Sequence, residues 1–216
     1  MDISWMGHSC FRVRTRDALV VMDPYNKIQG LDLGRPKADI VTISHDHPGH
    51  NNAAAVKGEP TPELVNGPGE YEISGMFITG VRTYHDDDLG AKLGRNTVYI
   101  LESEGLVLAH LGDLGHALSP EQVELMSSVD ILLVPVGGGN SLGPQRAAEI
   151  VANLEPSIVI PMHYQTAPGQ DRLEGVDHFC KEVGLSTYET TDRLTVRKSD
   201  VGETAQVKVL APRPAS

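Results

Sequence analysis

The chain has 216 residues, which is enough for one sizeable domain with a substantial core. Its residues are 40% hydrophobic and 22% charged, a composition that excludes a wholly disordered chain. Acidic residues outnumber basic ones by 29 to 18, and the resulting net charge of −11 disfavours binding to nucleic acid. The chain starts without the features of an export signal, has no apolar run near the roughly 18 residues of a membrane span and no CxxC pair, so we expect a cytoplasmic protein without membrane contact.

Short apolar runs between turn residues predict that the first half of the chain is mainly β-sheet. A Glu104-Gly105 turn separates the last two strands of this half. The expected strands cover residues 3–5, 10–15, 19–22, 40–43, 97–101 and 106–109, with further strand-like stretches between 63 and 83.

From residue 119 the pattern changes to helices alternating with strands. Ser119-Pro120 is typical of a helix start, with Ser as the N-cap and Pro in the first position, and we expect this helix to reach Ser127. The other expected elements are helices at 144–154 and 176–183, and strands at 131–134, 158–160, 194–197 and 206–210. No repeat or linker interrupts this order, so we expect one α/β domain over residues 1–216 that ends in a frayed tail from Pro212 to Ser216.

Three histidines stand within six residues, directly after the strand expected at 40–43. In His45-Asp46-His47-Pro48-Gly49-His50, a tight turn can present several imidazole nitrogens to one point, which suits zinc and its neighbours in the transition series. The alternative interpretation is a polar surface turn.

Single ligand-type residues also follow other expected strands. His85 follows the strand that reaches Thr83, Asp113 follows the run from Leu106 to Leu111, and His163 follows the run from Ile158 to Met162. Each of them alone would more often be structural. Because the C-terminal strand ends of a layered sheet form one rim, we expect these residues to converge with the histidine turn.

The order of these residues resembles the metallo-β-lactamase fold hydrolases. The resemblance is carried by Asp23-Pro24, His45-x-His47-x-x-His50, His85, Gly112-Asp113 and Pro161-Met162-His163-Tyr164. More narrowly, residues 3–10 and 21–24 resemble the uncharacterised branch related to ascorbate-phosphate lactonase. The resemblance implies an α/β (α+β) four-layer αββα sandwich and a metal-dependent hydrolase that uses activated water on a small-molecule ester, lactone or phosphodiester.

The resemblance also implies a set of ligands. His45, His47 and His85 would hold a first metal, His50 and His163 would hold a second together with the aspartate of an HxHxDH motif, and Asp113 would bridge the two and serve catalysis. One or two Zn²⁺ ions are expected, with Mn²⁺, Fe or Ni²⁺ as the other candidates. His116 is a candidate catalytic residue that could contact substrate or stabilise an oxyanion, with loop packing as the alternative.

Gly49 stands where the family motif has its aspartate. Glycine has no side chain to bind the second metal or to orient the nucleophilic water. Three outcomes are open: a first site alone, a weakened second site, or a site that binds metal and turns over poorly. A non-catalytic metal-binding module is therefore the second functional hypothesis.

Several neighbouring residues have open roles. Asp46 or Asp86 could replace the missing carboxylate. His8 and Asp23, at the ends of early strands, could hydrogen-bond to metal-binding imidazoles, with turn and capping roles as the alternative. The glycine-rich segment 137–143 lacks the GK[ST] of a nucleotide-binding loop, so we expect it to border the metal pocket. The sequence carries no indication of the oligomeric state.

Overall fold

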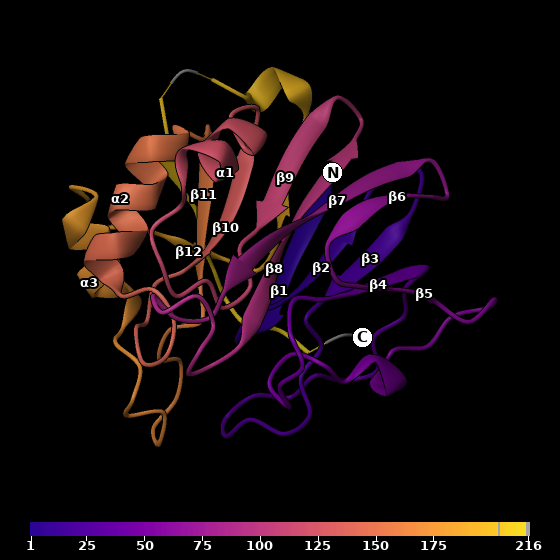
Figure 1. Ribbon diagram of the computed structural model, residues 1–216, viewed down its shortest axis with the longest axis horizontal. Coiled ribbons are helices and arrows are strands. Elements are labelled where there is room, and N and C mark those ends of the chain that lie inside the picture. Colours follow the sequence, from indigo (N-terminus) through magenta and orange to yellow (C-terminus); the bar gives the residue numbers. More distant parts are fainter. Residues whose placement is uncertain (203, 215–216) are drawn as a thin grey trace.

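The computed structural model describes residues 1–202 and 204–214, in which two β-sheets pack face to face (Figure 1). The first sheet has six strands: β1 (Asp2–Gly7), β2 (Cys10–Arg14), β3 (Leu19–Met22), β4 (Ile40–Ile43), β5 (Glu63–Asn66) and β13 (Leu194–Thr195). The second sheet has seven: β6 (Gly69–Ile73), β7 (Met76–Tyr84), β8 (Arg95–Ser103), β9 (Leu106–His110), β10 (Ile131–Pro135), β11 (Ile158–Met162) and β14 (Gln206–Val207).

Both sheets are mixed. In the first sheet, of order β13-β1-β2-β3-β4-β5, the pairs β1–β2 and β2–β3 are antiparallel, whereas β3–β4 and β4–β5 are parallel. In the second, of order β14-β11-β10-β9-β8-β7-β6, the strands from β6 to β9 are antiparallel and those from β9 to β14 are parallel. Every residue of β10 and β11 is buried, as expected for parallel strands covered on both faces.

The main hydrophobic core includes side chains from both sheets. Trp5 and Phe11 of the first sheet and Ile78 and Leu101 of the second are all almost completely buried in this one cluster. On β7 the buried and more exposed residues alternate from Met76 to Thr79 and again from Val81 to Tyr84, because successive side chains of a strand point to opposite faces.

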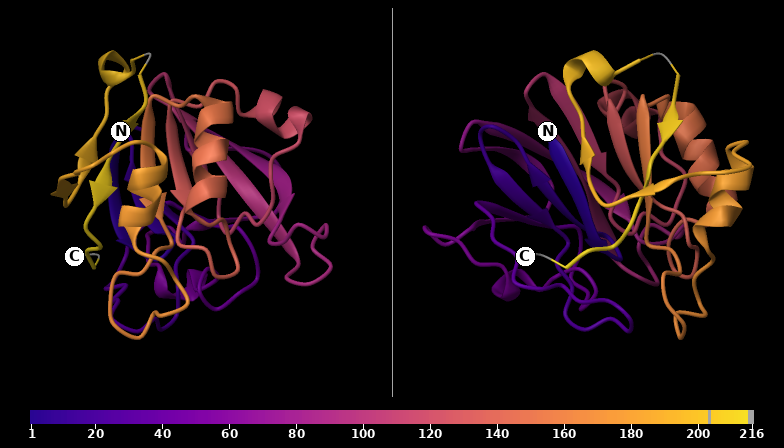
Figure 2. Two further views of the ribbon diagram at one scale, coloured as in Figure 1. Left: turned by 90° about the vertical axis from the view of Figure 1, so that its left-hand side faces the viewer. Right: turned by 180° about the vertical axis from the view of Figure 1, so that it is seen from behind.

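Three α-helices cover the outer face of the second sheet (Figure 2): α1 (Pro120–Leu125), α2 (Pro144–Leu154) and α3 (Val176–Glu182). The buried residues of α2 recur every three or four positions, which forms one apolar stripe toward the sheet. The helix expected from Ser119 has a capping box between Ser119 and Gln122 and ends two residues earlier than expected, at Leu125.

The outer face of the first sheet is covered differently. Here Met6, Val21 and Val41 pack against Tyr25 and Leu33, which belong to the long connection between β3 and β4. The short 3₁₀ helix η1 (Ala53–Ala55) completes this layer. The expected sandwich is confirmed, but in the described residues this outer layer is made of loop and 3₁₀ helix, because the Gly- and Pro-containing segment 26–37 disfavours an α-helix.

The C-terminal part also differs from expectation. The strand expected at 206–210 is divided into β14 and β15 (Val209–Leu210), and β15 pairs with β12 (Thr190–Thr191) in a separate two-stranded sheet. A further 3₁₀ helix, η2 (Lys198–Asp200), follows β13. The prediction of a frayed tail is wrong at residue 213, because the Arg213 N–H donates to the Trp5 carbonyl at 2.9 Å. Residues 215–216 lie outside the described residues.

Candidate metal centre

The predicted ligands meet at one edge of the two sheets, at the ends of four strands (the lower edge in Figure 1). His45 and His50 follow β4, His85 follows β7, Asp113 follows β9 and His163 follows β11. All five are buried, with between 0% and 8% of each residue exposed. His47 is exposed, and its ring stacks on that of His45 with 5.8 Å between centroids. The structure therefore brings all six predicted metal ligands together.

Asp113 lies at the centre of this cluster. Its Oδ2 is 3.1 Å from His50 Nε2 and 3.4 Å from His85 Nε2, and its Oδ1 is 3.4 Å from His163 Nε2. The two oxygens of one carboxylate thus face histidines on either side. This arrangement suits a carboxylate shared between two metal ions.

Several buried nitrogens of the cluster lack a hydrogen-bond partner. Within the part of the chain that the structure describes, His45 Nε2, His50 Nε2 and His85 Nδ1 are buried and make no well-aligned hydrogen bond, although His50 Nε2 lies 3.1 Å from the Asp113 carboxylate. Leaving such atoms unpaired is costly. Three groups of side chains have their ligand atoms within 4.8 Å of one another: His45–His47–His50, His45–His85–Asp113 and His8–His50–His163. A divalent metal would satisfy these nitrogens, so the residues present fit a metal centre.

Asp23 orients two of the histidines. It is fully buried, and its Oδ2 accepts hydrogen bonds from His50 Nδ1 at 2.8 Å and from the Ser44 hydroxyl at 2.5 Å. The same hydroxyl lies 3.0 Å from His45 Nδ1. Because these contacts occupy the Nδ1 atoms, the Nε2 atoms of His45 and His50 are left for a metal, which is the supporting role considered for Asp23.

Asn96 holds Asp113 in place, a role that the sequence did not predict. The Asp113 N–H donates to Asn96 Oδ1 at 3.0 Å, while Asn96 Nδ2 donates to Thr83 Oγ1 at 2.7 Å and to the Leu111 carbonyl at 3.0 Å. Asn96 therefore connects β7, β8 and the segment that carries Asp113. The available signal was an asparagine just before the apolar run from Val98 to Leu101.

His8 lies inside the cluster. Its backbone has a φ of 55°, and its carbonyl accepts hydrogen bonds from Trp5 Nε1 at 2.9 Å and from the His163 N–H at 3.0 Å. The centroid of its ring is 4.1 Å from that of His163 and 4.9 Å from that of His50. His8 is therefore positioned among the ligands and is itself a candidate.

Burial and charge set the protonation of the metal-free cluster. Burial disfavours the charged form of His50, but Asp113 and Asp23 outweigh it and raise its pKa to about 10. For Asp113, burial is outweighed by His163 and His50, which hold its pKa well below the usual range. Burial lowers the pKa of His45 to about 4 and also lowers those of His8 and His163. Near neutral pH His8, His45 and His163 thus favour the neutral form that metal ligands require.

Comparison with known proteins identifies the family. The profile of the β-lactamase superfamily domain matches residues 2–163. The UPF0173 protein of Pyrococcus furiosus is 30% identical over 192 residues, which cover 81% of this chain and 88% of the relative. The chain belongs to the UPF0173 family of the metallo-β-lactamase superfamily.

Other members extend the comparison. A UPF0173 protein of Methanopyrus kandleri, named a metal-dependent hydrolase, is 27% identical over 78% of this chain and 86% of its own. A Thermotoga maritima crystal structure, provisionally named a zinc-dependent hydrolase of the same superfamily, has a TM-score of 0.79 at 36% identity and covers 97% of this chain and 99% of its own. The Ignicoccus hospitalis metallo hydrolase Igni18, with a TM-score of 0.64 at 20% identity over 98% of this chain and 95% of its own, supports the fold alone.

In this UPF0173 protein, neither alternative carboxylate takes the place left by Gly49. Asp46 is exposed, and its Oδ1 accepts a hydrogen bond from Asn51 Nδ2 at 2.6 Å. The carboxylate of Asp86 accepts four backbone N–H groups of the loop that follows His85, from Asp88, Gly90, Lys92 and Leu93. Asp86 therefore shapes this loop, and Asp46 is turned toward Asn51.

His116 is not among the described residues that line the metal cavity. Its Nε2 accepts the Tyr84 N–H at 3.1 Å, and its Nδ1 lies 2.7 Å from the Ala117 carbonyl. Both nitrogens are therefore engaged with the backbone at the end of β7. A part in catalysis stays a prediction, and the geometry agrees better with loop packing.

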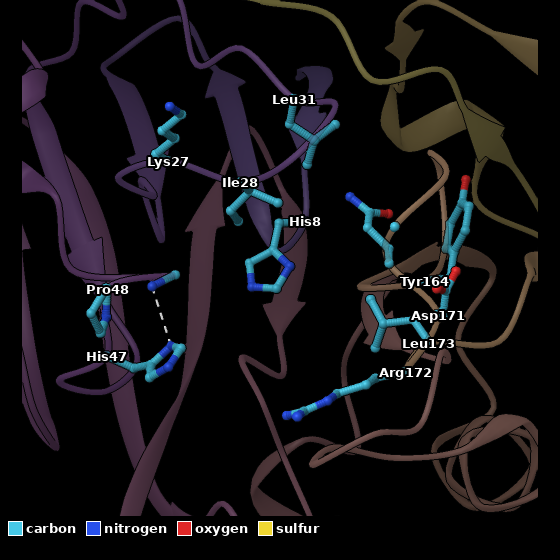
Figure 3. Close-up of a pocket in the computed structure, with 13 residues that line it drawn as sticks. His8, Lys27, Ile28, Leu31, His47, Pro48, Tyr164, Asp171, Arg172 and Leu173 are labelled. Atoms are coloured by element: carbon cyan, nitrogen blue, oxygen red, sulfur yellow. Dashed lines mark hydrogen bonds between the residues drawn. The ribbon is translucent and has the colours of Figure 1, made fainter.

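The metal cluster opens into a cavity of about 450 Å³, and a second hollow of about 530 Å³ adjoins it (Figure 3). His8, His47, Arg172 and Leu173 line both. The second hollow also has an apolar wall that includes Ile28 and Leu31, with Lys27 nearby. As expected, the glycine-rich loop reaches the metal cavity, which is also lined by Gly139 and Asn140. In the part of the chain that the structure describes, no helix is long and apolar enough to cross a membrane.

Proposed function

We propose that this chain is a metal-dependent hydrolase whose small-molecule substrate carries an anionic group. The observation that supports this most directly is the buried cluster of unpaired nitrogens beside an open cavity. Structural zinc sites are closed by four protein ligands, whereas catalytic sites keep a position open toward substrate. The names of the Methanopyrus kandleri and Thermotoga maritima relatives support the same proposal.

The chain supplies the binding and orienting parts of such a reaction. His45, His47, His85 and Asp113 would hold a first ion. A divalent ion there supplies Lewis acidity and acidifies water to a pKa near ~7. The buried Asp113 stays ionised because its pKa is held low, so it can serve as a ligand across the working pH range. Leu93 and Leu173 border the cavity and limit the access of bulk water.

The two hollows suggest how substrate is held. Arg172 extends from the 165–175 loop toward the side of the pocket that carries His47 (Figure 3). A guanidinium there can bind a carboxylate or phosphate oxygen in two parallel hydrogen bonds. The apolar wall around Ile28 and Leu31 would bind the rest of the molecule. Esters, lactones and phosphodiesters with an anionic group are the proposed class, and the resemblance to the lactonase branch adds phosphorylated lactones.

The test is turnover of a panel of p-nitrophenyl esters, lactones and bis-p-nitrophenyl phosphate by the zinc-loaded protein. We expect hydrolysis that a chelator abolishes and that His45→Ala reduces by more than ~100-fold. Loss of a residue that hydrogen-bonds to a metal ligand typically costs about 10–100-fold in activity, and loss of the ligand itself should cost at least as much. Arg172→Ala should raise KM for anionic substrates about tenfold with little change in kcat, since a charged hydrogen bond is worth ~1.5–3 kcal/mol. His178→Gln, on the exposed side of α3, is the control.

Turnover that survives both chelation and His45→Ala would contradict the proposal. No turnover across the panel, with metal and an anionic ligand bound normally, would favour the second hypothesis of a non-catalytic binding module. That hypothesis depends on Gly49, which removes the carboxylate that the superfamily motif places at this position.

A further inference from the structure

We propose that His8 is a ligand of the second metal and occupies the position that the superfamily motif gives to the aspartate at residue 49. This inference rests on the proposed metal-dependent function. It assigns a second site made of His8, His50 and His163 together with the shared Asp113.

The first observation concerns space. A Cβ atom built on Gly49 would lie 2.9 Å from His8 Nε2 and 3.4 Å from His8 Cδ2. Contacts under 3.0 Å to a Cβ essentially never occur, so a side chain at residue 49 would require the His8 ring to move from its present place. In its present place, the imidazole of His8 therefore lies in part of the space that an aspartate at residue 49 would use.

The second observation is the direction of the donors. The ligand atoms of His8, His50 and His163 all lie within 4.8 Å of one another. His50 and His163 are the two histidines that the resemblance assigns to the second metal. His8 thus completes a group of three imidazoles at the site that lost its carboxylate.

The third observation is that supporting roles around these ligands are already filled. His50 Nδ1 binds Asp23 at 2.8 Å, and His163 Nδ1 faces the Ser141 hydroxyl at 3.4 Å. Metal-binding histidines ordinarily use one outer partner each. The Nδ1 atoms of both rings thus already have a neighbour other than His8, which supports direct ligation as the role of His8.

The backbone holds His8 in place for this role. Its carbonyl is fixed by the Trp5 indole and by the backbone N–H of His163, which is itself a ligand. A ligand anchored to another ligand loses little conformational freedom when the metal binds.

The exchange of aspartate for histidine changes the donor set. One anionic oxygen is replaced by one neutral nitrogen, so the second site has three imidazoles and a single shared carboxylate. Imidazole suits zinc, copper and nickel, whereas carboxylate and water suit manganese and magnesium. The second site should therefore discriminate against Mn²⁺ more strongly than the carboxylate-containing version.

The experiment measures metal content per chain after loading with Zn²⁺ and dialysis, and the absorption spectrum of the Co²⁺-loaded protein. We expect about two ions in the natural chain and about one in His8→Asn. Asparagine is the test residue because it tolerates the left-handed backbone found at His8, so the fold is preserved. His178→Gln, exposed on α3 and outside the described lining of both hollows, is the control.

A ligand-exchange variant sharpens the test. His8→Asn combined with Gly49→Asp frees the space and restores the motif carboxylate, so the second ion should return, and Mn²⁺ should compete with Zn²⁺ better than in the natural chain. Gly49→Asp alone should gain less affinity for the second ion than the double variant, because the new side chain must first displace the His8 ring. Circular dichroism and thermal unfolding confirm that each variant is folded.

The outcomes separate this inference from the proposed function. Two ions bound with unchanged affinity in folded His8→Asn would overturn the role of His8 and leave the hydrolase intact. A natural chain that binds only one ion would also overturn it. A natural chain that binds no metal would contradict the proposed function itself.

Discussion

Asp23 decides which nitrogen of His50 faces the metal centre. Its carboxylate is fully buried and receives the Ser44 N–H, the Ser44 hydroxyl and His50 Nδ1. With Nδ1 engaged, only Nε2 can reach a metal. The same carboxylate acts on His45 through the Ser44 hydroxyl, so one residue orients two ligands.

Asp23→Asn should therefore weaken metal binding about 10–100-fold, the usual effect of losing a partner of ligating histidines. The measurement is the zinc dissociation constant by competition with a chromophoric chelator. Asp39→Asn is the matched control, because Asp39 also accepts a backbone N–H, from Leu19 at 2.8 Å, and is exposed. Equal affinities for the two variants would show that Asp23 does not orient His50.

The sequence is sufficient to predict the candidate ligands whose role follows from their position directly after a strand. His45, His47 and His50 are adjacent in the chain, and His85, Asp113 and His163 follow strands that end at the same edge. The sequence alone is insufficient to predict the positions of His8 and Asn96 in the cluster. The role of His8 depends on its distance from residue 49, and that of Asn96 on three segments that meet only after folding.

At the scale of elements, two loops build the wall of the larger hollow. The 165–175 loop packs on the connection after β3, where Gln170 Nε2 donates to the Gln29 carbonyl at 2.9 Å. Gly30 has a φ of +78°, and a Cβ there would lie 2.3 Å from the Cβ of Ala167. The absence of a side chain at residue 30 is thus what allows the loops to meet.

Gly30→Ala should separate these loops and leave the metal sites unchanged. Hydrogen exchange of the 165–175 amides should become faster, while metal content stays that of the natural chain. Gly184→Ala is a close control, since Gly184 has a φ of +79° and nothing within 4 Å of its Cβ. Both changes should cost about 1–2 kcal/mol of stability for the left-handed backbone. Faster exchange in both variants, or in neither, would contradict the contact.

Strand positions were predictable because short apolar runs between turns leave few alternatives. The expected strand at 40–43 and helix at 144–154 agree with β4 and α2 to the residue. The layer over the first sheet was not predictable, because Tyr25 and Leu33 lie in a segment without a regular period. The anchored tail was missed because its contact, from Arg213 to Trp5, spans almost the whole chain.

At the scale of the whole molecule, the histidines determine how stability depends on pH. Burial is the main cause that lowers the pKa values of five of them: His8, His45, His47, His110 and His163. These groups take up protons more readily when unfolded, so their contribution to stability falls as pH drops below 6.5. The pKa of His50 is shifted in the opposite direction. Its contribution to the free energy of unfolding is therefore complete below pH 6.5 and is lost as the pH rises toward about 10.

The free energy of unfolding of the metal-free protein should therefore be greatest near pH 6.5, as measured by urea unfolding between pH 5 and pH 9. With zinc bound the maximum should move to higher pH, because metal competes with protons for the same nitrogens. A metal-free stability that rises steadily up to pH 9 would show that the pair between His50 and the two aspartates does not stabilise the fold.

Trp5 links distant parts of the protein through its two polar groups. Its carbonyl accepts the N–H of Arg213, its indole N–H binds the carbonyl of His8, and its ring centroid lies 4.9 Å from that of Tyr164, next to His163. It is also the single tryptophan of the chain. The protein thus contains one tryptophan in contact with the backbone of His8, at the proposed second metal site, and selectively excited tryptophan emission can follow occupancy of that site without a label.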